Sequence, residues 1–406
     1  MTKRVAVIGA GAAGTMAAIF AAAAGAETLL LERTRDGGRK ILISGGGRCN
    51  VLPARVDETR FVTDSSPNTL RKIIRAWPLP EQIAFFEREL GIPLVEETES
   101  AKLFPASHRA RDVRDGLLAH AERLGVGVHR DTTVTSFAAA NGGWRIDRLG
   151  AEPLDVETLV VATGGLSVPN TGSDGLGLRV LERLGHTIHP TYAALTPLTA
   201  EPASFGILSG VSLPVTLTAR SEHRSATASG GFLFTHHGYS GPSVLDVSHV
   251  VVRARAEAAA AQVQVRWTSL DEAAVDAALR PQGTRTVLGV VRTLVPDRLA
   301  SLLLEQAGVD PTRSLAELPR DERRRVVEAL VRGTLPWTGD EGYKKAEVTG
   351  GGVSLAEVDP RTLESRRHPG LYICGEALDA FGPIGGYNFL WAWATGRAAG
   401  QGAARA

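Results

Sequence analysis

Residues 4–32 constrain the fold more than any other part of this chain, because they read as a complete strand, helix and strand. A short apolar strand ends at Ile8. Three glycines follow with the spacing G-x-G-x-x-G, namely Gly9, Gly11 and Gly14. An Ala-rich helical pattern then runs to Gly25, a typical C-terminal cap, and a second apolar strand ends at Glu32. The segment predicts a βαβ unit of a parallel sheet.

Each conspicuous residue of this unit has a role in holding a dinucleotide. Gly9 permits the tight turn after the strand, and Gly11 lacks the side chain that would keep the backbone away from a pyrophosphate. Gly14 lets the helix pack closely on the sheet, and the helix N-terminus presents unpaired N–H groups to the phosphates. Glu32 is placed to accept hydrogen bonds from the ribose hydroxyls. A dinucleotide site is therefore predicted.

The alternative interpretation of this segment is a secretory signal, since Lys3 and Arg4 precede an Ala-rich stretch. That interpretation leaves the glycine spacing and Glu32 without explanation. Two cysteines make no disulfide framework, so we predict a reducing, cytoplasmic setting.

Composition excludes several classes of partner. The 406 residues allow two or three domains, and the formal net charge of +1 gives no electrostatic case for nucleic acid or an anionic membrane. The basic run at residues 323–325 is flanked by acids and indicates a solvated helix face. After the first segment, no uncharged apolar run is long enough to span a bilayer. We predict a small-molecule substrate and make no prediction of the oligomeric state.

A glycine-rich loop, GGRKILISGGGRCN, occupies residues 37–50. Its backbone N–H groups can approach a ligand closely. Its polar side chains supply donors for phosphate or ring oxygens, and they include Arg39, Lys40, Ser44, Arg48 and Asn50. A flexible surface loop is the alternative, but the position directly after the dinucleotide unit favours a loop that lies over the ligand. Cys49 is interpreted as structural, because no partner cysteine is adjacent.

GAGAAG at residues 9–14 and this loop together resemble the flavoprotein family called HI0933-like or BaiN-like. Later segments agree with it: LFPASHRARDV around Phe104, ATGG at Ala162, FTHHGYSGP at Phe234, and a long motif from Thr349 that includes GGYNFLWAWATG. The resemblance covers nearly the whole chain. It implies an NAD(P)/FAD-dependent oxidoreductase, and some members of the family are described as aminoacetone oxidases.

Between residues 195 and 337 the βαβ pattern stops. Alternating apolar segments predict a small β-subdomain with strands at 211–219, 232–236 and 262–267. Helical patterns lie at 271–279, 286–307 and 314–332. We therefore predict a discontinuous α/β domain, Rossmann-like and of the glutathione-reductase type, that binds FAD. It comprises residues 1–194 and 338–406, and an inserted β plus helical domain occupies residues 195–337.

Two later strand ends return to the cofactor. A strand at 158–163 ends in Gly164 and Gly165, and a strand at 371–374 ends at Gly375 and Glu376. Asp174 is a possible N-cap of the helix that follows it. A helix that opens after Gly385 and Gly386 would direct its N-terminus at the pyrimidine edge of the flavin, where it favours the anion formed on reduction. Trp391 and Trp393 are interpreted as packing residues.

The predicted FAD-binding residues are Gly9, Gly11, Ala12, Ala13, Gly14, Glu32, Arg33, Arg39, Lys40, Ser44, Gly45, Gly46, Asn50, Val134, Thr163, Gly164, Gly165, Asp174, Gly375, Glu376, Gly386, Tyr387, Asn388 and Phe389. No catalytic residue and no metal site is assigned. The segment GYSGP at Ser240 misses the G-x-S-x-G spacing, and no strand-to-helix context is apparent, so a hydrolase is not favoured. His186 and His189 lack further ligand-type residues at metal spacing.

The sequence favours an FAD-dependent oxidoreductase that works as an NAD(P)H-dependent reductase of an unidentified small molecule. Because a second dinucleotide fingerprint is missing, NADH or NADPH would visit the flavin face directly, in a cleft shared with the substrate. Two alternatives remain open: a flavin oxidase of a small amine such as aminoacetone, and a non-catalytic scaffold that binds flavin or is linked to RNA. The balanced charge speaks against RNA.

Overall fold

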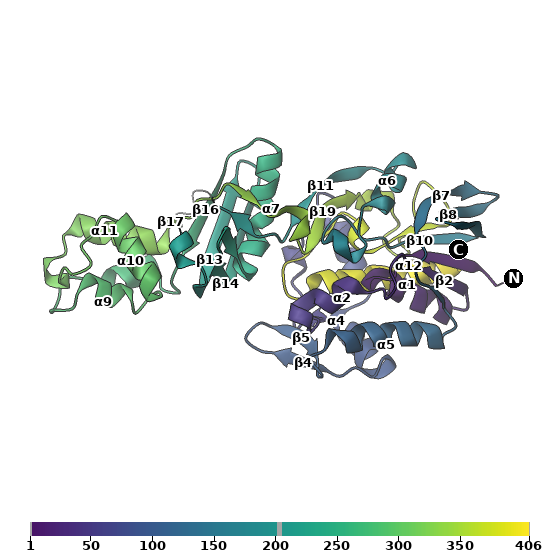
Figure 1. Cartoon of the computed structure of the whole chain (residues 1–406), viewed down its shortest axis with the longest axis horizontal. Helices are drawn as coiled ribbons and strands as arrows, with labels where there is room; N and C mark the ends of the chain where they lie inside the picture. The colour runs from purple at the N-terminus through teal and green to yellow at the C-terminus, as the bar shows by residue number, and fades with distance from the viewer. Residues whose placement is uncertain (1, 201–204, 406) are drawn as a thin grey trace. The chain divides into compact units, whose positions relative to one another are not determined.

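The computed structural model describes residues 2–200 and 205–405, and the chain divides into two compact units (Figure 1). Unit 1 comprises Met1–Tyr192 and Glu347–Ala406, and unit 2 comprises Ala193–Ala346. The sequence placed the end of the insert at residue 337. Unit 2 continues further because β18 (Gly339–Asp340) pairs with β12 (Leu198–Thr199), which lies in the same unit.

A five-stranded parallel sheet forms the centre of unit 1. Its strands, in spatial order, are β20 (Leu371–Ile373), β10 (Thr158–Val161), β1 (Arg4–Ile8), β2 (Glu27–Leu31) and β6 (Gly127–His129). All residues of β10 and β20 are buried, as expected of parallel strands that are covered on both faces. The predicted Rossmann-type α/β fold is confirmed.

Helices α1 (Ala12–Ala23) and α12 (Tyr387–Arg405) pack tightly against each other beside this sheet. Two glycines of α12 permit the close approach, because a Cβ on Gly396 or Gly400 would lie 2.3 or 2.2 Å from a carbonyl oxygen of α1. The other longer helices of unit 1 are α3 (Pro67–Arg75), α4 (Leu79–Ala84), α5 (Ala110–Arg123) and α6 (Leu176–Arg183). Unit 1 thus brings the N-terminal and C-terminal helices of the chain side by side.

Three smaller sheets complete unit 1. The first joins β3 (Leu52–Pro53), β5 (Lys102–Pro105) and β4 (Leu94–Glu97), in that order. The second is antiparallel and consists of β7 (Val134–Ala140), β8 (Gly143–Arg148) and β9 (Ala151–Val156). The third pairs β11 (Ile188–Ala194) with β19 (Val348–Val353). A hairpin joins β7 and β8, and Asn141 and Gly142 both have positive φ at its turn.

Unit 2 contains a seven-stranded sheet and a set of helices with a core of their own. In spatial order the strands are β17 (Gly333–Thr334), β16 (Ala261–Arg266), β13 (Ser212–Ser221), β14 (Ser225–Phe234), β15 (Gly238–Ser240), β12 and β18. The helices are α7 (Pro242–Ala256), which packs on β13 and β14, and α8 (Glu272–Ala278), α9 (Val287–Val291), α10 (Asp297–Gln306) and α11 (Arg320–Val331).

Prolines explain where the predicted helices of unit 2 differ from the observed ones. The pattern at 286–307 is two helices, because Pro296 precedes α10 and cannot continue α9. The pattern at 314–332 begins as a 3-10 turn, and α11 starts only after Pro319. Ser240 ends β15 and α7 begins at Pro242, so a strand-to-helix turn that the sequence did not reveal is present. No helix in the described part of the chain is long and apolar enough to cross a membrane.

Candidate functional site

The turn between β1 and α1 forms one wall of a cavity of about 720 Å³ in unit 1. Gly9 has a φ of +103°, and a Cβ on Gly14 would lie 1.8 Å from its carbonyl oxygen, so both positions require glycine. A Cβ on Gly11 would meet no atom within 4 Å, and Gly11 lines the cavity. Open space therefore adjoins the α1 N-terminus, whose first N–H groups lack intrahelical acceptors. This arrangement can bind a phosphate.

Glu32 is buried at the end of β2 and faces the same cavity. One carboxylate oxygen accepts a hydrogen bond from the Ala10 N–H at 2.8 Å. The other accepts from the N–H of Thr34 at 2.8 Å and from its hydroxyl at 2.6 Å. A carboxylate offers about four acceptor positions, so about one is left for a ligand hydroxyl. Glu32 thus fixes its own loop as well as facing the cavity.

Arg33 and Asp174 form an ion pair on the cavity wall beyond Glu32, with 2.6 Å between Nη1 and Oδ2. Burial opposes the charge of Asp174, but hydrogen bonds from Arg33 and the Leu176 N–H hold the pKa of this carboxyl below its ordinary value. The sequence suggested Asp174 as a possible N-cap of α6, but Asp174 does not occupy that position. Gly175 occupies that position with a φ of +75°, and Asp174 accepts from the Leu176 N–H at 3.0 Å.

The glycine-rich loop folds as α2 (Arg39–Ile43) followed by a 3-10 turn at Ser44–Gly47. A Cβ on Gly45 would lie 3.1 Å from the Phe104 ring, whereas one on Gly46 would meet no atom within 4 Å. The loop therefore packs at one glycine and leaves open space at the next. Cys49 is completely buried, and burial raises the pKa of its thiol to about 12. The thiol is therefore protonated at neutral pH.

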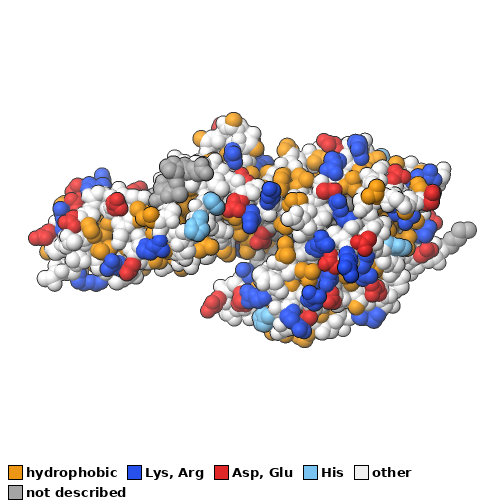
Figure 2. Space-filling view, in the orientation of Figure 1, with side chains coloured by type: hydrophobic (Ala, Val, Ile, Leu, Met, Phe, Trp, Pro, Cys, Tyr) orange, Lys and Arg blue, Asp and Glu red, His pale blue; other side chains and the backbone are white. Residues whose placement is uncertain are grey.

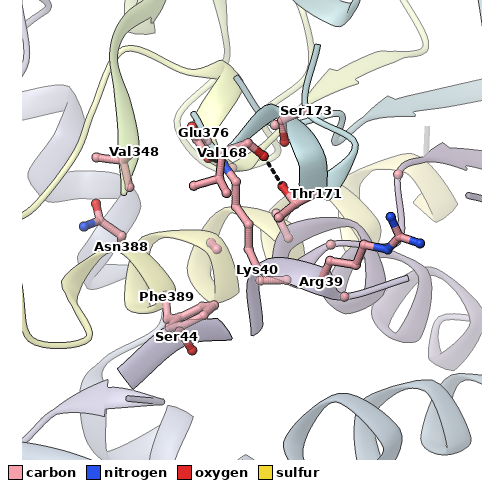
Figure 3. A pocket seen from close by; sticks show the side chains of 18 of the residues that line it. Arg39, Lys40, Ser44, Val168, Thr171, Ser173, Val348, Glu376, Asn388 and Phe389 are labelled. Carbon is pink, nitrogen blue, oxygen red and sulfur yellow. Dashed lines mark hydrogen bonds and ion pairs between the residues drawn. The ribbon is translucent and has the colours of Figure 1, made fainter. Parts of the chain in front are cut away.

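Lys40 and Glu376 form an ion pair with 2.6 Å between Nζ and Oε2. Figure 3 shows Lys40 reaching from α2 toward Glu376, while Arg39 points away from it. Ser167 joins the pair: its hydroxyl lies 2.6 Å from Lys40 Nζ and 2.5 Å from the second oxygen of Glu376. Burial opposes the charge of Glu376, but Lys40 and the hydrogen bonds outweigh it and lower the pKa of the carboxyl. The cavity wall thus carries an ionised, partnered carboxylate.

The residues before and at the start of α12 close the other end of the cavity. Gly386 has a φ of +90°, and a Cβ there would lie 2.4 Å from the backbone of Leu52. The Asn388 side chain exchanges two hydrogen bonds of 2.9 Å with the backbone of Gly382, so it holds the turn. Phe389 stacks on Trp393 with 5.3 Å between ring centroids and also lines the cavity.

Three of the predicted site residues do not line the cavity. Gly14 lies behind the turn at the α1–sheet contact, and Gly165 packs against Thr349. The hydroxyl of Tyr387 donates to Arg55 O and accepts from the Asp57 N–H, both at 3.3 Å. All the other predicted residues line the cavity. Trp391 lines it as well, although its indole N–H donates to Gly375 O at 3.1 Å.

Sequence reasoning left several wall residues out of the predicted set, among them Arg48, Lys102, Phe104, Phe381 and Gly385. Arg48 belonged to the recognised glycine-rich loop and could have been included. Lys102 and Phe104 lie on the short strand β5, and although Phe104 belongs to the recognised segment LFPASHRARDV, neither residue was assigned to the cofactor. They reach the cavity because β5 pairs with β3, directly after the glycine-rich loop. Pairing between separate segments therefore decided their position.

The cavity fits FAD by three features of the chain itself. Its volume suits a large organic ligand. Open space adjoins the α1 N-terminus at Gly11, and Glu32 keeps an acceptor position at the end of β2. These are the groups that hold the pyrophosphate and the ribose of a dinucleotide in Rossmann-type folds.

Comparison with known proteins agrees with this geometry. The family model for the HI0933-like protein Rossmann domain matches residues 3–402. A ribosomal RNA dihydrouridine synthase of Escherichia coli K12 is 32% identical over 402 residues, which cover 97% of this chain and 96% of that protein. A 3-dehydro-bile acid delta(4,6)-reductase of Clostridium scindens is 30% identical over 410 residues, which cover 99% of both proteins.

Among solved structures, a 3-ketosteroid delta1-dehydrogenase of Sterolibacterium denitrificans aligns over 100% of both chains with a TM-score of 0.55 and 12% identity, and therefore shares the fold. The family model spans nearly the whole chain, and the relatives match over almost their full lengths. The chain belongs to the HI0933-like family and is an FAD-dependent oxidoreductase.

Proposed function

We propose that this protein is an NAD(P)H-dependent reductase that adds hydrogen across a carbon–carbon double bond conjugated to a carbonyl group. The continuity of the cavity carries this proposal. The cavity extends from the dinucleotide turn at Gly11 past Lys40 to Lys102, Phe104 and Gly385. A flavin held at the turn would share the cavity with its substrate.

The names of the two relatives support the type of reaction. A dihydrouridine carries two hydrogens more than uridine, at a ring double bond conjugated to a carbonyl. A delta(4,6)-reductase of a 3-dehydro bile acid likewise acts on double bonds conjugated to a ring ketone. One reaction class therefore accounts for both names, although the molecules differ greatly in size.

Different wall residues would bind different parts of FAD along the cavity. Glu32 and Arg33 would hold the adenosine half of FAD, and the α1 N-terminus at Ala12 and Ala13 would hold the pyrophosphate. When bound, FAD supplies the two-electron chemistry, because it can accept a hydride from a nicotinamide and pass it to an acceptor. Lys40 and Glu376 fix the wall between the two halves. The α12 N-terminus places a positive dipole end at the far end of the cavity.

Anaerobic stopped-flow absorbance at the flavin band tests the proposal. We expect NADH or NADPH to bleach the flavin, and 2-cyclohexen-1-one or a 3-oxo-Δ4 steroid to restore the absorbance. Donor and acceptor share one cleft, so steady-state kinetics should be ping-pong. Bleaching by aminoacetone, with peroxide formed in air, would instead establish the oxidase. If no donor bleaches the flavin, the non-catalytic scaffold would be the interpretation that remains.

Uracil within ribosomal RNA is the second candidate substrate, and the full-length match to the E. coli enzyme favours it. The charge distribution opposes it: the net charge is +1, and Figure 2 shows acidic and basic side chains intermingled over the visible face. Incubating the reduced protein with ribosomal RNA and measuring dihydrouridine by mass spectrometry decides between the two. Formation of dihydrouridine without turnover of free enones would make RNA the substrate.

A further inference from the structure

Lys102 lies on the cavity wall at the α12 end, away from the dinucleotide turn. It begins β5, where it stands opposite Pro53 of β3 and Glu97 of β4. Its side chain lines the cavity, and a Cβ on Gly385 would lie 3.8 Å from its Cε. Lys102 is therefore beside the turn at Gly385 that precedes α12.

Lys102 is not held in a close ion pair with any described residue, unlike the other cations on the cavity wall, although its charge contributes with Ser100 and Arg48 to lowering the pKa of Glu97. The four others are ion-paired: Arg33 with Asp174, Arg39 with Asp36, Lys40 with Glu376 and Arg48 with Glu97. Lys102 forms no hydrogen bond or ion pair with any residue in the described ranges 2–200 and 205–405. Its cross-strand neighbour Glu97 is already engaged, because Ser100 donates to one oxygen at 2.5 Å and Arg48 to the other at 2.9 Å.

A second polar group on the wall also lacks a partner. The side-chain oxygen of Asn50 is buried and accepts no hydrogen bond from the residues described. That oxygen has almost no accessible surface, so a ligand in the cavity does not reach it in this arrangement of the side chain. Lys102 offers a cation, and the α12 N-terminus a positive dipole end. The wall thus suits a ligand that has an electron-rich oxygen.

We propose that Lys102 is a catalytic residue whose ammonium group binds the carbonyl oxygen of the substrate. This inference rests on the proposed reductase function. Addition of a hydride to the β-carbon moves the double-bond electrons toward the carbonyl and leaves negative charge on its oxygen, beside the ammonium. The α-carbon then takes a proton from solvent, and NAD(P)H supplies the electron pair. A cation placed where this charge develops accelerates the step, because it stabilises the transition state more than the substrate.

4-Nitrophenol tests the inference without turnover, because its phenolate imitates the charged oxygen and its two protonation states differ in colour. Titrated against the oxidised FAD-containing protein, it should bind as phenolate, with its pKa lowered by about 1–3 units as expected beside an opposite charge. Lys102→Met should abolish that shift, and Lys102→Arg should keep it. Lys72→Met, at an exposed position on α3, is the matched control and should behave as wild type.

Reaction kinetics provide a second test of this inference. Lys102→Met should slow flavin reoxidation by 2-cyclohexen-1-one by about 100-fold or more, the scale for loss of one oxyanion donor, and should slow it more than it slows bleaching by NADPH. An unshifted 4-nitrophenol pKa in the wild type, or a wild-type shift in Lys102→Met, would overturn the inference. Loss of FAD from Lys102→Met but not from Lys102→Arg would also overturn it, by assigning the lysine to the cofactor. The titration needs no electron donor, so it can succeed even if the reductase proposal fails.

Discussion

The two ends of the cavity differ in how their polar groups are satisfied. At the dinucleotide end, Glu32 accepts three hydrogen bonds from the protein and Arg33 is paired with Asp174. At the α12 end, Lys102 and the side-chain oxygen of Asn50 have no partner within the part of the chain that the structure describes. The charged side chains of the first end are paired within the protein, whereas Lys102 at the second end is not paired with any described residue.

This difference suits two kinds of ligand. Groups that are held by the protein itself keep their geometry and lose little freedom on binding, which favours a cofactor that stays bound. A cation without a partner in the protein is available to a ligand that brings negative charge. Variants at the first end should therefore change folding or FAD retention, whereas variants at the second should change ligand recognition.

The largest effect is expected from the glycines of the dinucleotide turn, because they separate folding from cofactor binding. A side chain at position 14 would overlap the backbone of Gly9, so Gly14→Val should destabilise the protein by more than about 3 kcal/mol. Gly11→Val has space and an extended backbone, so the apoprotein should stay within about 0.5 kcal/mol of wild type but lose FAD. Urea unfolding and FAD titration measure the two effects. Retention of FAD by Gly11→Val would contradict the phosphate site.

The Lys40–Glu376 pair should give the next largest effect. Lys40→Met leaves a largely buried carboxylate without its cation and should lower the free energy of unfolding by about 3 kcal/mol. The value is at the lower end of the range for buried pairs, because this pair is not fully buried. The double variant Lys40→Met with Glu376→Gln should regain most of that stability. Equal stability of the single and double variants would show that the pair is not coupled.

The same pair predicts a dependence of stability on pH. The pKa of Glu376 lies below its ordinary value of 4.5, so the stabilisation is fully present above about pH 4.5 and is lost as the pH falls through the lowered pKa. Melting temperatures of wild type and Lys40→Met should therefore differ most at neutral pH and converge in acid. A constant difference down to about pH 3 would contradict this linkage.

Glu32 should give a smaller effect on two measurements at once. Glu32→Ala removes a ligand acceptor, and FAD affinity should fall by about 1–3 kcal/mol. It also leaves the Ala10 and Thr34 N–H groups without their acceptor, so the apoprotein should lose stability too. Lys102→Met should instead leave the melting temperature within about 2 °C of wild type. A loss of stability in both variants would remove the distinction between the two ends of the cavity.

The central sheet could be predicted because its information is local. The strand, turn and helix of residues 4–32 each follow from adjacent residues, and the observed β1, α1 and β2 lie there. The helices of unit 2 were harder, because a periodic pattern does not show where Pro296 and Pro319 interrupt it. The short strands β4 and β9 were missed, since each depends on a pairing partner rather than on a motif.

The site residues likewise differ in whether local sequence or packing determines their position. The dinucleotide end contains a continuous fingerprint, so its glycines and Glu32 were found from their spacing. The α12 end is assembled from the glycine-rich loop, β5 and the turn before α12, and only their meeting in space brings Lys102 beside Gly385. Conversely, Tyr387 and Asn388 lie in a conspicuous motif, yet their side chains hold backbone turns at residues 55–57 and 382. A motif identifies the segment, and packing decides which of its side chains face the ligand.

Cys49 should give the smallest effect, although it lies in the loop between the two ends. It is fully buried and its pKa is raised to about 12, and the second free thiol, Cys374, is buried too although its residue lines the cavity. A protonated, inaccessible thiol is a poor nucleophile, so iodoacetamide should modify neither cysteine in the folded protein and both in urea. Cys49→Ser should keep FAD and reduce it within a few-fold of the wild-type rate. Loss of flavin reduction in Cys49→Ser with FAD still bound would make this thiol part of the redox chemistry and would extend the reactive end of the cavity into the glycine-rich loop.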